Sequence, residues 1–197
     1  MKKFALVFAF MLTEIENLIV SCGGGALPQI FRGRAESAVR KSTTLYVAGL
    51  ASELAAVNGS TLRNIVKKIA SENNIGSNHL QKDTSFLAQE LAVVFQDAGE
   101  GITLKTATWD SEPPAAFLNG EFKIEVKGTG ICFEAPGNDI GGTKFATTGN
   151  EDIFRPISPV LFKSEKEFDL IFNTVGAYNG FYKILLRGEM YTKPSSN

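Results

Sequence analysis

The chain has 197 residues, 44% of them hydrophobic, and its 20 Lys or Arg and 21 Asp or Glu leave a net charge of −1. At this length we expect one domain of moderate size, or a sandwich with a helical attachment. Two cysteines and one histidine exclude a disulfide framework and a closed Cys/His zinc site. The sequence therefore predicts no metal centre; a calcium ion held by the acidic groups at residues 138–139 and 150–152 is the alternative. No motif predicts a cofactor.

Charge is distributed unevenly along the chain. Residues 1–82 carry ten Lys or Arg and five Asp or Glu, a net charge of +5, whereas residues 83–197 carry ten and sixteen, a net charge of −6. This separation suits head-to-tail assembly, or a shell whose inner side meets nucleic acid or anionic lipid. Chance segregation on solvated faces is the alternative.

Residues 1–28 form an apolar segment followed by a glycine hinge. Residues 4–12 look like the apolar core of a signal peptide, and residues 19–22 resemble a bacterial lipobox, which makes Cys22 a candidate for lipidation. Glu14 and Glu16 interrupt the apolar stretch, and such charges are costly to insert into a membrane. A retained apolar helix or strand is therefore the alternative. The same glutamates, followed by residues 27–29, also resemble a pilin amino terminus, although the Cys-Gly-Gly-Gly insert would break the long helix of that family.

Residues 29–101 are predicted to be a helical region. Apolar residues recur near the helical spacing across residues 35–57, and Ser60 can cap a second helix. A third helix is predicted to begin at residues 83–85 and to carry the apolar residues Phe86, Leu87, Leu91, Val94 and Phe95. Four basic residues near the start of the region are candidate contacts for a polyanion or lipid headgroups: Arg32, Arg34, Arg40 and Lys41. A solvated helix face is the alternative.

Residues 102–197 are predicted to form an antiparallel β-sandwich. Residues 102–109 are expected to be its first strand, and apolar residues alternate with polar ones in residues 122–126 and 168–172. Residues 136–159 are rich in Gly, Asn, Thr and Pro, and we expect a long loop there. The side chains expected in the core are Phe122, Ile124, Val126, Phe168, Leu170 and Ile184.

No group of residues predicts an enzyme. His79, the only histidine, sits in a polar stretch without the oriented base and nucleophile that a catalytic triad needs. Glu121 with Glu125, and Glu165 with Glu167, lie at i,i+4 and i,i+2 on predicted strands. Such carboxylates could form a glycosidase pair, but we interpret them as solvated strand positions.

The two segments DIFRPISPVLFKSEKEFDLIFNT and GFYKILLRGEMYTKP close the β-rich part of the chain. The first segment contains a strand bounded by prolines, followed by a strand with alternating apolar residues. The second segment is a last strand that ends in a short polar tail. With these segments, residues 117–192 resemble the single jelly-roll coat proteins of viruses. The resemblance implies a mainly β fold, an antiparallel sandwich of jelly-roll type with a helical N-terminal region, and a shell subunit whose basic arm lies on the inner side.

The expected function is therefore structural. Copies of the chain would assemble with one another into a virion shell or another extracellular assembly, with nucleic acid or anionic lipid as a partner on the basic side and no small-molecule substrate. The alternative is a lipid-anchored or secreted bacterial surface protein of the cell envelope, anchored through Cys22, which binds a ligand with its 136–159 loop. A pilin-like filament subunit comes third.

Overall fold

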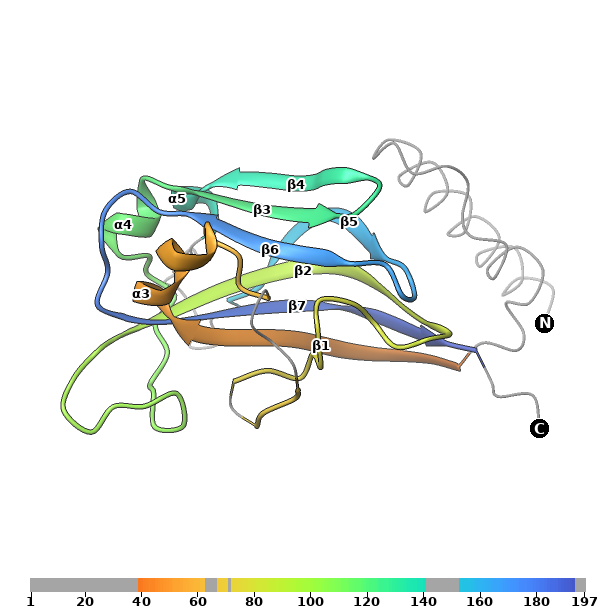
Figure 1. Ribbon diagram of the computed structural model, residues 1–197, viewed down its shortest axis with the longest axis horizontal. Coiled ribbons are helices and arrows are strands. Elements are labelled where there is room, and N and C mark those ends of the chain that lie inside the picture. The colour runs from red at the N-terminus through yellow and green to blue at the C-terminus, as the bar shows by residue number, and fades with distance from the viewer. Residues whose placement is uncertain (1–38, 63–66, 71, 141–152, 194–197) are drawn as a thin grey trace, which may run out of the picture.

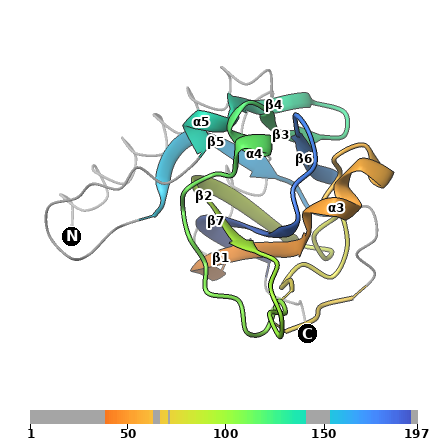
Figure 2. The same ribbon diagram turned by 90° about the vertical axis from the view of Figure 1, so that its left-hand side faces the viewer.

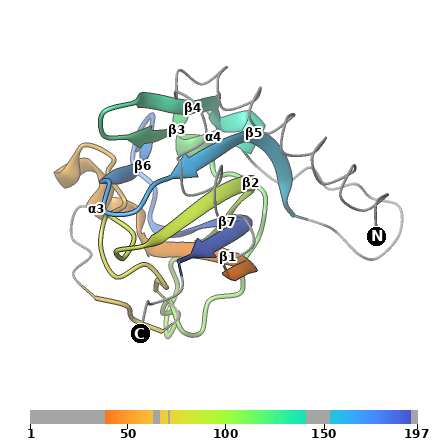
Figure 3. The ribbon, with the colours of Figure 1, turned by 90° about the vertical axis from the view of Figure 1, so that its right-hand side faces the viewer.

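The computed structural model describes residues 39–62, 67–70, 72–140 and 153–193. These residues form two antiparallel β-sheets that face one another as a sandwich (Figures 1, 2 and 3). The four-stranded sheet has the order β1-β7-β2-β5, and the three-stranded sheet has the order β4-β3-β6. The mainly β, antiparallel sandwich predicted from the sequence is thus confirmed.

The strands occupy β1 (Val39–Leu50), β2 (Thr84–Asp97), β3 (Glu121–Val126), β4 (Gly130–Pro136), β5 (Arg155–Phe162), β6 (Phe168–Asn173) and β7 (Gly180–Thr192). Short helices lie between them: α3 (Ala51–Leu54), η1 (Ala55–Val57), α4 (Ala115–Leu118) and α5 (Gly137–Ile140). None of the helices among the described residues has the length and the apolar character that crossing a membrane requires.

The strand pairs are nested along the chain. The first strand, β1, pairs with the last, β7, while β2 pairs with β5 and β3 with β4. The segment between β1 and β2 is bridged to β6 at Ser60 and Ile171, with hydrogen bonds of 3.0 Å from Thr61 N to Leu170 O and from Phe172 N to Gly59 O. The chain therefore crosses repeatedly between the two sheets, and each crossing brings distant segments side by side.

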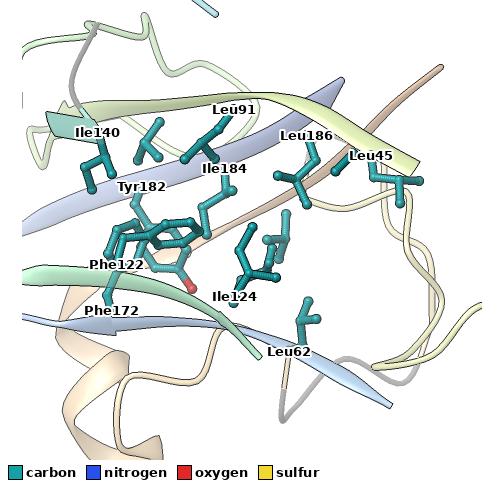
Figure 4. Packing of buried hydrophobic residues seen from close by; sticks show 14 of the residues in the cluster. Leu45, Leu62, Leu91, Phe122, Ile124, Ile140, Phe172, Tyr182, Ile184 and Leu186 are labelled. Atoms are coloured by element: carbon teal, nitrogen blue, oxygen red, sulfur yellow. The ribbon is translucent and has the colours of Figure 1, made fainter. Parts of the chain in front are cut away.

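The core lies between the two sheets, where aliphatic and aromatic side chains from both layers interdigitate (Figure 4). Phenylalanine rings make many of the contacts across the layers; the ring centroids of Phe162 on β5 and Phe168 on β6 are 4.4 Å apart. All six side chains expected in the core are buried: Phe122, Ile124, Val126, Phe168, Leu170 and Ile184.

The prediction that residues 29–101 are helical is wrong for the two long elements of this region, which are both strands. Val39–Leu50 is β1 and Thr84–Asp97 is β2; only α3 and η1 are helical within the predicted first helix. In β2, Leu91 and Val93 point into the core, while Ala92 and Val94, which point the other way, are also buried. A strand covered on both faces does not alternate between apolar and polar residues. Its continuous apolar sequence therefore cannot be distinguished from that of a buried helix.

The strand predicted at residues 102–109 is also wrong. These residues belong to the connection between β2 and α4, green in Figure 1, which passes along the outer side of the four-stranded sheet. The connection is attached to the end of β2 by Asp110, whose backbone N and O bond to Phe95 O and N at 2.8 and 2.7 Å. Thr108 N adds a bond of 3.0 Å to the Gln96 side chain. Within the expected loop at 136–159, α5 and the first part of β5 are ordered elements, and residues 141–152 lie outside the described part.

The free edge of β1 is covered by a side chain. The Asn74 amide accepts a hydrogen bond of 2.7 Å from Tyr46 N and donates one of 2.7 Å to Thr44 O. Ala48 N donates to Glu72 O at 2.6 Å. Because these backbone groups are already bonded, this part of the edge is a poor template for strand pairing with a second copy.

Candidate functional site

The outer face of the three-stranded sheet carries an excess of carboxylates. On β3, Phe122, Ile124 and Val126 are buried, so the residues between them face outward. The same alternation holds on β6, where Phe168, Leu170 and Phe172 are buried. The outer surface of the three-stranded sheet therefore carries five carboxylates and two ammonium groups. We call this surface the acidic face; its residues are Glu121, Glu125, Glu134, Glu167 and Asp169, with Lys123 and Lys127.

Both lysines of the acidic face are already paired. Lys123 Nζ lies 3.0 Å from Glu121 and 2.7 Å from Glu134, and Lys127 Nζ lies 2.7 Å from Glu167. Hydrogen bonding to Lys123 lowers the pKa of Glu121, and hydrogen bonding to Lys127 lowers that of Glu167. These pairs keep the carboxylates charged at neutral pH, so the face retains a net negative charge of three when all its groups are ionised.

A groove of about 510 Å³ opens beside this face. Glu125, Lys127, Glu167 and Asp169 line it together with Ile171 and with residues that precede β2: Val57, Asn58, Ser60 and Asn78. The groove exists because the segment after η1 crosses over β6 and bridges to it at Ser60. An apolar side chain and several carboxylates in one concave surface are suited to a cationic, partly apolar partner.

Asp169 is the most buried carboxylate of the groove. Burial raises its pKa above the ordinary value, and the neighbouring Glu125 adds to the increase. Hydrogen bonds from the Ser60 side chain and from the backbone of Leu170 and Leu62 act in the opposite direction without cancelling it. The Leu170 N–H donates to Asp169 Oδ1 at 2.8 Å.

Asp169→Asn is expected to remove a pH-dependent cost to stability. With its raised pKa, the folded protein binds a proton at Asp169 more tightly than the unfolded chain, so the free energy of unfolding falls as the pH rises from about 3.8 through the raised value. The variant should therefore gain stability relative to the wild type as the pH rises through this window. Urea unfolding at several pH values measures the difference, and Asp139→Asn at an exposed position controls for the change of charge. A difference that is constant with pH would contradict the expectation.

Two of the four basic residues singled out in the sequence lie at the start of β1. Arg40 forms an ion pair with Glu189 on β7, and hydrogen bonding to Glu189 raises the Arg40 pKa. The same carboxylate accepts a hydrogen bond of 2.5 Å from the Tyr191 hydroxyl. Lys41 is exposed and lies opposite Met190. Arg32, Arg34 and Cys22 lie outside the described residues, so the structure brings together only Arg40 and Lys41.

The sequence marked the glutamates of β3 but did not identify the acidic face as a site. The pattern that could have revealed the acidic face is an acidic residue at alternate positions of two strands. Only the pairing of β3 with β6 shows that these positions are neighbours. In the part of the chain that the structure describes, no three His, Cys, Asp or Glu side chains are grouped so that they could hold a metal ion. Comparisons with protein-family models, curated proteins and solved structures found no match.

Proposed function

We propose that the chain is a structural subunit that assembles with copies of itself, built as a jelly roll and forming a virion shell or a similar extracellular assembly. The nested strand pairs support the jelly roll. In that fold a long antiparallel pair of chain segments is wound into two sheets, so the first strand lies beside the last and the inner pairs follow in order. The β1–β7, β2–β5 and β3–β4 pairs, with the Ser60–Ile171 bridge between the first two, have this order.

Fold alone does not decide function, since jelly rolls also occur in lectins and enzymes. The observation that carries the assembly proposal is the acidic groove between β6 and the segment after η1. Its charge is opposite to that of residues 32–41, which carry Arg32, Arg34, Arg40 and Lys41 and which we call the basic segment. A basic segment of one copy bound in the groove of the next makes a head-to-tail contact, which repeats from copy to copy and closes into a ring or shell when the rotation permits.

The contact within one molecule would contribute little, because exposed ion pairs are worth about 0–1 kcal/mol each. Repeated over many copies, the same pairs add up and are weakened by salt, since the screening length is only about 8–10 Å at physiological ionic strength. The proposal therefore requires an assembly whose size falls as salt concentration rises.

Glu125→Gln/Glu167→Gln tests the groove. The substitutions keep the shape of both side chains and remove two of its charges, so we expect the particle seen by light scattering at low salt to shrink or to form only at higher protein concentration. The matched control is Glu100→Gln/Asp139→Asn, which removes two exposed carboxylates away from the groove. The assembly proposal fails if the wild type is monomeric at every salt concentration. If the two variants assemble equally well, the groove is not the contact between copies.

A further inference from the structure

A second cavity, of about 360 Å³, lies on the outer side of the four-stranded sheet. Val94 and Leu185 form its floor, and the connection between β2 and α4 supplies Trp109, Asp110 and Ser111, with Ile153 and Lys183 completing the lining. The cavity is separate from the acidic groove, because its lining comes from β2, β7 and their covering loop instead of β3 and β6.

Lys183 brings a positive charge into this apolar cavity. Its side chain is half-buried, and its Nζ lies 4.9 Å from the centre of the Tyr46 ring and 5.5 Å from that of Trp109. No carboxylate among the described residues lies within 4.0 Å of this ammonium group. Burial lowers the Lys183 pKa, as expected for a cation that has lost water without gaining an anion.

The neighbouring cation on β7 is different. Arg187 stacks on the Phe154 ring at 3.6 Å and forms an ion pair of 3.0 Å with Glu90. On the same outer face Arg40 is paired with Glu189. Lys183 is therefore the cation of this face that lacks a carboxylate partner within the described residues, and it is the one that lines a cavity.

Ser111 adds a hydrogen-bonding group to the same cavity. Its side chain is buried, at 8% exposure, and it lines the space beside Lys183. Within the described residues its hydroxyl forms no hydrogen bond. Because it lines the cavity, the hydroxyl is open to it, and a ligand oxygen beside Lys183 would accept a hydrogen bond from Ser111 as well.

We propose that this cavity binds a small molecule with an apolar body and a single carboxylate. The apolar body would contact Val94, Leu185 and the Trp109 ring, and the carboxylate would accept from Lys183 and Ser111. A monoanion fits better than a phosphate, because the site offers one cation and one hydroxyl, while Asp110, which also lines the cavity and accepts a bond of 3.0 Å from Glu112 N, repels additional negative charge.

Trp109 is the only tryptophan of the chain, so its fluorescence reports directly on the cavity. Octanoate is expected to produce a saturable change in Trp109 emission. Octylamine has the same alkyl chain and the opposite charge, and we expect it to bind at least about tenfold more weakly. Lys183→Met should weaken octanoate binding by a similar factor, because it keeps the length of the side chain and removes its charge. Lys82→Met, at an exposed position outside the cavity, should leave octanoate binding unchanged.

The comparison of octanoate with octylamine on the wild type decides the proposal even if Lys183→Met fails to fold. Equal responses to the two compounds would mean that only the apolar body is recognised, and would overturn it. The proposal would also be overturned if octanoate gave no saturable response. The same holds if a folded Lys183→Met variant bound octanoate as tightly as the wild type.

Discussion

Replacing Phe168 by alanine is expected to lower the free energy of unfolding by about 3–5 kcal/mol. The side chain is 3% exposed, and its ring lies 4.4 Å from that of Phe162 on the opposite sheet. The substitution removes a contact between the two layers and leaves a cavity that the paired strands cannot easily fill. Urea unfolding, followed by far-ultraviolet circular dichroism, measures the loss.

Val175→Ala is the control for the Phe168 experiment. Val175 is 62% exposed, and a substitution at an exposed position should change the free energy of unfolding by less than about 0.5 kcal/mol. A loss below about 1 kcal/mol for Phe168→Ala would mean that the contact between the sheets carries little of the stability.

Simultaneous replacement of the four basic residues by alanine is expected to disperse the assembly. The variant changes Arg32, Arg34, Arg40 and Lys41. If their charges are used between copies, or against a polyanion, the wild type should sediment more slowly as salt rises, and the variant should sediment slowly even at low salt. Sedimentation velocity of both proteins at low and high salt measures this. If both sediment alike at every salt concentration, the basic segment is not an interaction surface.

The ion pair between Arg40 and Glu189 supplies the matched control. Arg40→Ala alone removes a contact within one molecule, and we expect it to leave the size of the assembly almost unchanged. A variant that changes only Arg32, Arg34 and Lys41 should then reproduce the effect of the fourfold substitution. If Arg40→Ala alone disperses the assembly, the basic segment acts through the pairing of β1 with β7 and not through contacts between copies.

The acidic and basic variants together identify the partner of the basic segment. If the two types of variant weaken the assembly equally, the segment binds the groove of the next copy. If only the basic variant weakens it, the partner is a separate polyanion, such as nucleic acid or anionic lipid. The particle recovered from the native source should then contain that polyanion.

The sequence alone determined β3 and β6, two strands with one face in the core and one facing outward. In β3, Phe122, Ile124 and Val126 alternate with charged residues, and the structure buries all three. This pattern is local, because each side chain faces the direction that the pleat of its own strand imposes. The sequence likewise located Phe168 and Leu170 of β6 and Ile184 of β7 in the core.

Only the tertiary structure decided the nature of β1 and β2 and the location of both proposed sites. Ala92 and Val94 on β2 are buried on the outer side, where the connection between β2 and α4 runs. That cover removes the polar alternation by which a strand is recognised. The acidic groove and the Lys183 cavity are formed by segments far apart in the chain: Ser60 with Asp169, and Trp109 with Lys183. Their chemistry depends on distances that sheet pairing and loop packing set, and no local pattern of residues encodes those distances.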